Sequence, residues 1–209
     1  ELRQLAALVL KQFVRAHWEH DDDDYDDADG DMMAPAAGRV VVCDAEKAAV
    51  RGALPAGLAD PAARIRTAVS MVIAGVAQWD WPDAWPELMR ALLRPLEAAT
   101  SSSAAAAAGG AGGEAAVAVA GVLRCLELCA SDLSEQHLPE ALRSLMPRLL
   151  AFVAAGVPHA RRERARAVHV MHVLLERVAT VCVDESVARR LQRGALGGWA
   201  SAALHALGS

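Results

Sequence analysis

Apolar residues recur at helical spacing along almost the whole chain. The first segment places them at Leu2, Leu5, Val9 and Phe13. This pattern ends near Trp18, and residues 19–44 carry little pattern and predict a loop. A short helix is predicted over about 45–54, because Pro55 and a nearby glycine form a common stop signal.

Two longer helices are predicted on either side of a turn rich in tryptophan and proline. Asp60 and Pro61 suit the N-cap and first position of a helix that runs to Trp79. Its apolar face is Ile65, Val69, Val72, Ile73 and Val76. The next helix should start near Asp83, with its face at Trp85, Leu88, Met89, Leu92 and Leu96. We expect Pro95 to kink or end it, because proline removes a helix hydrogen bond and clashes with the preceding turn.

The C-terminal half predicts two more pairs of helices after a segment of Ser, Ala and Gly. The first pair has its apolar faces at Val119, Val122, Leu123, Leu126 and Ala130, and at Leu142, Leu145, Met146, Leu149 and Val153. The second pair has them at Val168, Met171, Leu175, Val178 and Cys182, and at Val187, Leu191, Leu196, Trp199 and Leu204. Three glycines interrupt the middle of the last helix.

Taken in pairs, these helices occupy about 40 residues each, the unit length of HEAT repeats. The pattern therefore predicts an all-α fold, a HEAT-repeat α-solenoid of about four antiparallel hairpins; a compact helical bundle is the alternative. We divide the chain into hairpins over 1–98 with a loop insert at 19–44, a flexible insert at 99–113, and further hairpins over 114–209. The helical pattern is already under way at Glu1, so we expect the sequence to begin inside a longer chain.

Composition and charge exclude several classes of protein and indicate how the core is built. Hydrophobic residues make up 54% but aromatics only 4%, so Leu, Val and Ala must form the core. A net charge of −5 argues against direct nucleic-acid binding, which needs a basic surface, and favours a basic protein partner. The longest apolar run, 68–77, is too short to insert in a membrane. Four cysteines without a CxxC pair favour a reducing compartment over a disulfide framework.

Two segments resemble the importin-β superfamily of nuclear transport receptors. Residues 3–14, followed by His17 and Trp18, are similar to an early helix of these receptors, and residues 79–88 to the turn between two early helices. The family-motif positions are Leu10, Lys11, Trp18, Trp79, Asp80, Trp81, Pro82, Trp85 and Pro86. We expect them to be structural: Asp80 and Asp83 can cap a helix start, and Trp81 and Trp85 can fill the space between hairpins.

The resemblance implies a receptor that carries basic cargo through the nuclear pore. Its partners would be the small GTPase Ran in its GTP form, cargo such as core histones and ribosomal proteins, and nuclear pore proteins. It would shuttle between cytoplasm and nucleus. An exportin of the same superfamily, in which Ran and cargo bind together, and a HEAT-repeat scaffold outside transport are the alternatives.

In a receptor of this family, the inner helix of each hairpin normally contacts the partners, and we take this to be the second helix of each pair. We expect Glu46, Arg51, Glu87, Glu97 and Glu140 to be exposed there. A run of aspartates in the loop insert is either a solvated, self-repelling segment or a tether for basic cargo: Asp21, Asp22, Asp23, Asp24, Asp26, Asp27, Asp29 and Asp31. It fails as a calcium loop, because aligning Gly30 with the loop glycine puts Ala36 at the position of the bidentate glutamate.

No catalytic or cofactor motif is present, so we expect neither an enzyme nor a cofactor. His169 and His172 lie three residues apart on a helix, but spacing provides no further zinc ligands. Four arginines open the same helix, namely Arg161, Arg162, Arg164 and Arg166. They are either a charged helix start or a contact for an acidic surface of a partner.

Overall fold

The computed structural model describes residues 2–18, 42–155 and 161–181, with the backbone alone described at 102–112. The elements are α1 (Leu2–His17), α2 (Asp44–Ala53), the 3-10 helix η2 (Leu54–Ala59), α3 (Ala63–Asp80), α4 (Leu88–Thr100), α5 (Ser102–Asp132), the 3-10 helix η3 (Glu135–His137), α6 (Leu138–Ala154) and α7 (Arg161–Val181). Every regular element within these ranges is a helix, which confirms the predicted all-α class.

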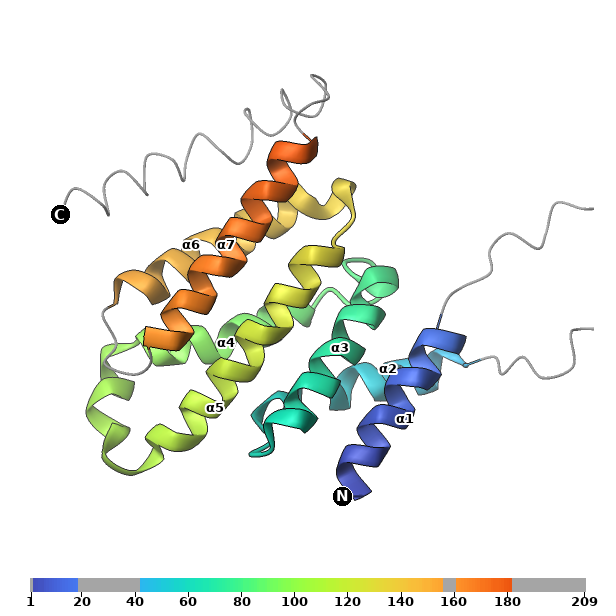
Figure 1. Ribbon diagram of the computed structural model, residues 1–209, viewed down its shortest axis with the longest axis horizontal. Coiled ribbons are helices and arrows are strands. Elements are labelled where there is room, and N and C mark those ends of the chain that lie inside the picture. The colour runs from blue at the N-terminus through green and yellow to red at the C-terminus, as the bar shows by residue number, and fades with distance from the viewer. Residues whose placement is uncertain (1, 19–41, 156–160, 182–209) are drawn as a thin grey trace, which may run out of the picture.

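The helices stack in two layers. In the first layer α1 packs against α3, α3 against α5, and α5 against α7, as Figure 1 shows. Behind it, α4 contacts α5 and α6, and α6 contacts α7. Helix α2 lies behind α1 and α3 in the same view. Each hairpin touches only its neighbours, so the described residues form a helical repeat solenoid.

Leucine and other aliphatic side chains form one continuous core between the layers. Leu88, Leu92 and Leu96 bring the buried face of α4 into it. Leu138, Leu142, Leu145 and Leu149 do the same for α6. Each fully buried leucine stabilises the fold by about 1.5–3 kcal/mol relative to an exposed one, so this interface provides most of the driving force for stacking.

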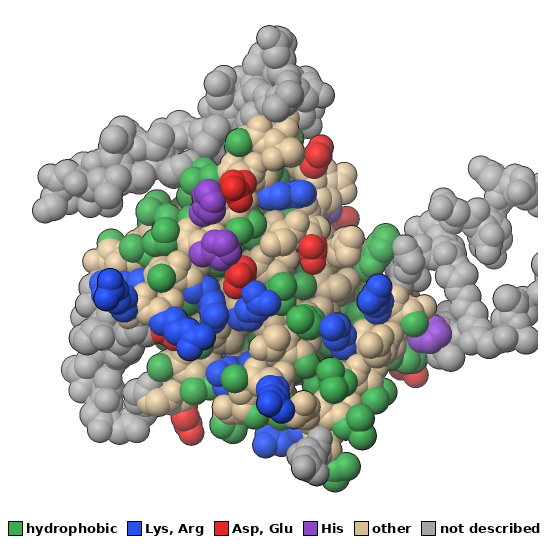
Figure 2. Space-filling model, viewed as in Figure 1, with side chains coloured by type: hydrophobic (Ala, Val, Ile, Leu, Met, Phe, Trp, Pro, Cys, Tyr) green, Lys and Arg blue, Asp and Glu red, His purple; other side chains and the backbone are tan. Residues whose placement is uncertain are grey.

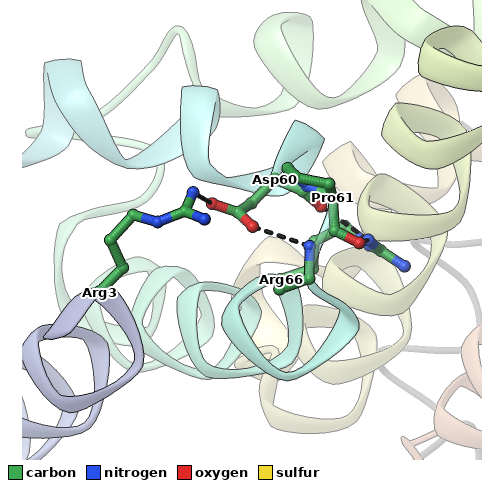
Figure 3. Close-up of polar contacts among 5 residues, drawn as sticks. Arg3, Asp60, Pro61 and Arg66 are labelled. Carbon is green, nitrogen blue, oxygen red and sulfur yellow. Dashed lines mark hydrogen bonds and ion pairs between the residues drawn. The ribbon is translucent and has the colours of Figure 1, made fainter. Parts of the chain in front are cut away.

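The segment before α3 is held by polar contacts with both neighbours. Asp60 Oδ1 accepts a hydrogen bond of 2.8 Å from the Ala62 amide, but the N-cap of α3 is Ala62 and not Asp60, contrary to the prediction. The helix itself begins at Ala63, two residues after Pro61. Arg3 of α1 donates to Asp60 Oδ2 at 2.6 Å, which fixes the first helix to the start of α3 (Figure 3).

Glycine allows α5 to approach η2 closely. A Cβ atom added at Gly121 would lie 2.1 Å from the carbonyl oxygen of Leu58 and 3.2 Å from Cδ of Arg66. Neither a backbone carbonyl nor a helix axis can move far, so only glycine permits this packing.

The predicted apolar face of α1 is wrong. Leu2 is 84% exposed, and Leu5 and Val9 are each 59% exposed. The core instead receives Ala7, Val14 and Trp18. Because α1 is apolar on more than one side, periodicity alone could not select the buried face.

The face predicted for α7 is partly right. Val178 is buried, and Met171 and Leu175 are partly buried against the core, as predicted, whereas Val168 is 47% exposed. Ala167, Val170, Leu174 and Val181 are also buried, so the buried face is offset from the predicted one. The predicted partner helix over 187–204 lies outside the described residues.

Pro95 does not end α4, which was one of the two outcomes predicted for it. The helix runs through it to Thr100, with Leu92 and Leu96 buried on either side. Packing of these leucines against α5 and α6 stabilises the helix by more than the lost hydrogen bond costs. The helix also begins at Leu88 rather than near Asp83, since residues 81–87 form turns.

Residues 102–113 belong to helix α5 in the structure, where the sequence led us to expect a flexible insert. Alanine has the highest helix propensity, and five consecutive alanines precede the first glycine pair. The division into hairpins over 1–98 and 114–209 stays a prediction.

Candidate partner-binding surfaces

The turn between α3 and α4 is built around buried tryptophans. The backbone amides of Ala84 and Trp85 both donate to the carbonyl oxygen of Asp80 at 2.8 Å. Trp81 is 4% exposed and Trp85 is 5% exposed. These two side chains fill the space between hairpins, as the sequence predicted.

The carboxylate of Asp80 has a different role from the predicted helix cap. It is buried, and Arg51 of α2 donates to its Oδ2 at 2.8 Å. Helix α4 has Glu87 at its N-cap and no side-chain capping hydrogen bond, and Asp83 is exposed. Asp80 therefore connects the second layer to the first, and only a structure could reveal this partner 29 residues away.

The other motif tryptophans differ in exposure. Trp18 is 1% exposed, and Lys47 of α2 donates to its carbonyl oxygen at 3.2 Å with the ammonium 5.5 Å from the ring centroid. Trp79, by contrast, is 50% exposed. A structural role thus holds for Trp18, Trp81 and Trp85, whereas half of the Trp79 side chain is available to solvent.

Trp79 lies at a groove between α1 and α3. A hollow of about 270 Å³ is lined by both helices, including Lys11, Met71, Gln78 and Trp79. Leu10, the remaining α1 motif residue, is partly buried against the core. Pro82 and Pro86 belong to the turn, Pro82 half-buried and Pro86 exposed.

Four of the five residues predicted for the inner helices are exposed. Glu46, Glu87, Glu97 and Glu140 lie on α2, at the start of α4, on α4 and on α6. Arg51 is the exception, because its side chain is 15% exposed and paired with Asp80. All four exposed residues of this set are acidic, but α4 and α6 also expose Arg90, Arg94, Arg143 and Arg148, so the charges on this layer are mixed. The aspartate run, Asp21–Asp31, lies outside the described residues.

Two of these glutamates also serve the fold. Glu46 Oε2 accepts from the Cys43 amide at 3.0 Å and so caps the start of α2. Glu97 accepts from Arg148 of α6 at 2.7 Å, although its side chain is 53% exposed.

The two histidines of α7 bind carboxylates rather than each other. His169 Nε2 lies 3.4 Å from Glu127 Oε1, and His172 Nε2 lies 3.3 Å from Glu176 Oε1. Within the described ranges no three His, Cys, Asp or Glu side chains are grouped to hold a metal ion. None of the described helices is long and apolar enough to cross a bilayer.

Cys125 and Cys129 are buried neighbours on α5, with their sulfur atoms 4.0 Å apart. Burial raises the pKa of the Cys125 thiol well above its usual range, and the hydrogen bond between Cys125 and Cys129 acts in the same direction. The thiol is therefore protonated at neutral pH and unreactive, as expected of packing residues.

Comparison with known proteins agrees with the motifs. No protein-family model matches the chain. Importin-9 of Drosophila melanogaster is 36% identical over 95 residues, which are 46% of this chain. The matched segment is importin-like.

The importin-9 match covers 8% of that relative, so the chain spans a small part of its length. Together with the helical solenoid, it supports the resemblance that the Trp-Pro turn and the first helix suggested. The importin-like segment thus has the architecture expected of a piece of a larger repeat array.

Proposed function

We propose that the protein is a nuclear import receptor that binds basic cargo and the small GTPase Ran in its GTP form. The observation that supports this most is the 36% identity to importin-9 over 95 residues. The exposed glutamates on α2, α4 and α6 add to it, because carboxylates can pair with the lysines and arginines of basic proteins such as core histones or ribosomal proteins.

The proposed mechanism is an exchange of ligands. Ran and cargo compete for one flexible solenoid, so that Ran binding in the nucleus releases or rearranges the cargo. A coupling free energy of about 1–3 kcal/mol is enough to change cargo affinity by 5–150-fold. Small rotations between stacked hairpins add up along a solenoid, so binding of one ligand can change the shape of the surface that binds the other.

The test uses the complete protein and measures its affinity for Ran loaded with a GTP analogue or with GDP. Each titration is repeated with a core-histone pair present. Preference for the GTP form, together with weaker histone binding in its presence, supports an import receptor. A GTP preference that strengthens cargo binding indicates an exportin, and no affinity for Ran indicates a scaffold outside transport.

A further inference from the structure

Arginines from three helices converge on one hollow of the first layer. The hollow has a volume of about 250 Å³ and lies between the start of α3, the middle of α5 and the start of α7. Arg66, Arg124, Arg162 and Arg166 line it, and Glu163 is the only acidic residue among the lining residues. We call these four arginines and the hollow the arginine pocket. Figure 2 shows basic side chains gathered on this face of the molecule.

Few of these charges are neutralised by the protein itself. Glu127 beside the pocket lies 3.0 Å from Arg124 Nη1 and 3.8 Å from Arg166 Nε. The same carboxylate also contacts His169, so one negative charge serves two guanidinium groups and an imidazole. Arg162 is exposed and makes no hydrogen bond or ion pair with the described residues.

Arg66 is held in place by neutral acceptors. Its Nη1 donates to the carbonyl oxygens of Asp60 at 2.6 Å and Pro61 at 2.9 Å, as Figure 3 shows. Carbonyl groups orient the guanidinium without cancelling its charge. Arg66 therefore presents a fixed positive charge at the edge of the pocket.

The position of α7 increases the positive potential. Three of the first four residues of this 21-residue helix are arginines, at the end where the helix macrodipole is already positive. Cations at this end destabilise a helix, so the arrangement costs stability unless an anion binds nearby. Glu163 Oε2 is buried and has no hydrogen-bond partner among the described residues, so it does not form a hydrogen bond with these arginines.

We propose that the arginine pocket binds an acidic peptide segment of a protein partner. The planar guanidinium group matches a carboxylate with two parallel hydrogen bonds, and arginines on separate helices can receive two successive acidic side chains. The net charge of −5 and the carboxylates of Glu163 and Glu127 oppose any anion, so two acidic side chains that each pair with an arginine fit the site better than a continuous run of phosphates. This site is on the opposite layer from the exposed glutamates and does not depend on the proposed function.

The experiment measures fluorescence anisotropy of a labelled peptide with six consecutive glutamates, titrated with the complete protein. A peptide with glutamines in their place and a single-stranded oligonucleotide of similar length are the comparison probes. The variant R162Q/R166Q removes two pocket charges from residues that contribute little to the core. The control R143Q/R90Q removes two exposed arginine charges from α6 and α4 in the second layer.

We expect the glutamate peptide to bind and the glutamine peptide to fail. R162Q/R166Q should weaken binding about twentyfold and R143Q/R90Q less than about twofold, since charge-assisted hydrogen bonds are lost only in the first. Higher salt should weaken the wild-type interaction as well. No binding of the glutamate peptide, equal binding by R162Q/R166Q, or tighter binding of the oligonucleotide through the same arginines would each overturn the proposal.

Discussion

At the scale of single residues, the turn between α3 and α4 depends on one buried ion pair. Asp80 is 2% exposed, and its partner Arg51 comes from the other layer. Removing one member of such a pair leaves the other charge buried and unpaired. This lowers the free energy of unfolding by more than the intact pair contributes to it. The motif aspartate therefore matters for the fold through this partner rather than through a helix cap.

The substitution D80N tests that role. We expect the free energy of unfolding, measured by urea denaturation, to fall by about 2–4 kcal/mol because Arg51 loses its counter-charge. Arg148→Gln, which breaks the exposed pair with Glu97, should cost less than about 1 kcal/mol. If both variants lost the same free energy of unfolding, the buried pair would contribute no more to stability than the exposed one.

The structure predicts opposite effects on stability when each of two helical glycines is replaced by alanine. Gly121→Ala should destabilise the fold by about 3 kcal/mol or more, because the new Cβ would meet the Leu58 carbonyl at 2.1 Å. Gly52→Ala places its Cβ in open space on α2 and should stabilise by up to about 1 kcal/mol. Thermal unfolding of both variants gives the comparison, and stabilisation by Gly121→Ala would contradict the close approach of α5 and η2.

At the scale of elements, Pro95 shows that packing can override a local signal. Pro95→Ala should raise the free energy of unfolding by about 1–2 kcal/mol, since α4 regains a backbone hydrogen bond. Pro86→Ala, in the preceding turn, provides the control. Its free energy of unfolding should fall by up to about 1 kcal/mol, because the unfolded chain gains conformational entropy without the proline. A loss of stability in Pro95→Ala would mean that Leu92 and Leu96 need the geometry that proline imposes.

The existence of the helices could be predicted from the sequence, and so could the buried faces of α3, α4, α5 and α6, whereas the face predicted for α1 is wrong and that for α7 only partly right. Helical spacing predicted the buried faces of α3, α4, α5 and α6: Val72, Leu92, Leu126 and Leu145, for example, are all buried. In α1 and α7 several sides are apolar, so the choice between Val9 and Val14, or Val168 and Val170, depends on neighbours that only the fold supplies.

The residues of the candidate surfaces could be predicted only in part from the sequence. Exposed glutamates on the second helices follow from sequence order alone, because alternate helices of a solenoid belong to alternate layers. Arg51 could not be assigned, since its partner Asp80 is distant in sequence. The arginine pocket was only partly visible: the α7 arginines stood out as a run, whereas Arg66 and Arg124 are single residues that no local signal connects to them.

At the scale of the whole molecule, the two layers present different chemistry. The layer of α2, α4 and α6 exposes arginines (Arg90, Arg94, Arg143 and Arg148) as well as glutamates, whereas arginines from α3, α5 and α7 converge on one hollow of the other layer. The arginine pocket is the feature that suits an acidic segment, and the exposed glutamates are the groups that we propose for basic cargo. The separation allows each set of charges to be changed without altering the other.

The central proposal, that the exposed glutamates of the second layer bind basic cargo, is tested most directly by neutralising three of them in the complete protein. The variant E87Q/E97Q/E140Q is compared with E114Q/D132N/E176Q, which removes as many exposed acidic charges from α5 and α7 of the first layer. We predict that affinity for a core-histone pair falls about tenfold or more in the first variant and less than about twofold in the second. Equal losses in both would show that only total charge matters, and unchanged affinity in the first would contradict the assignment of this surface.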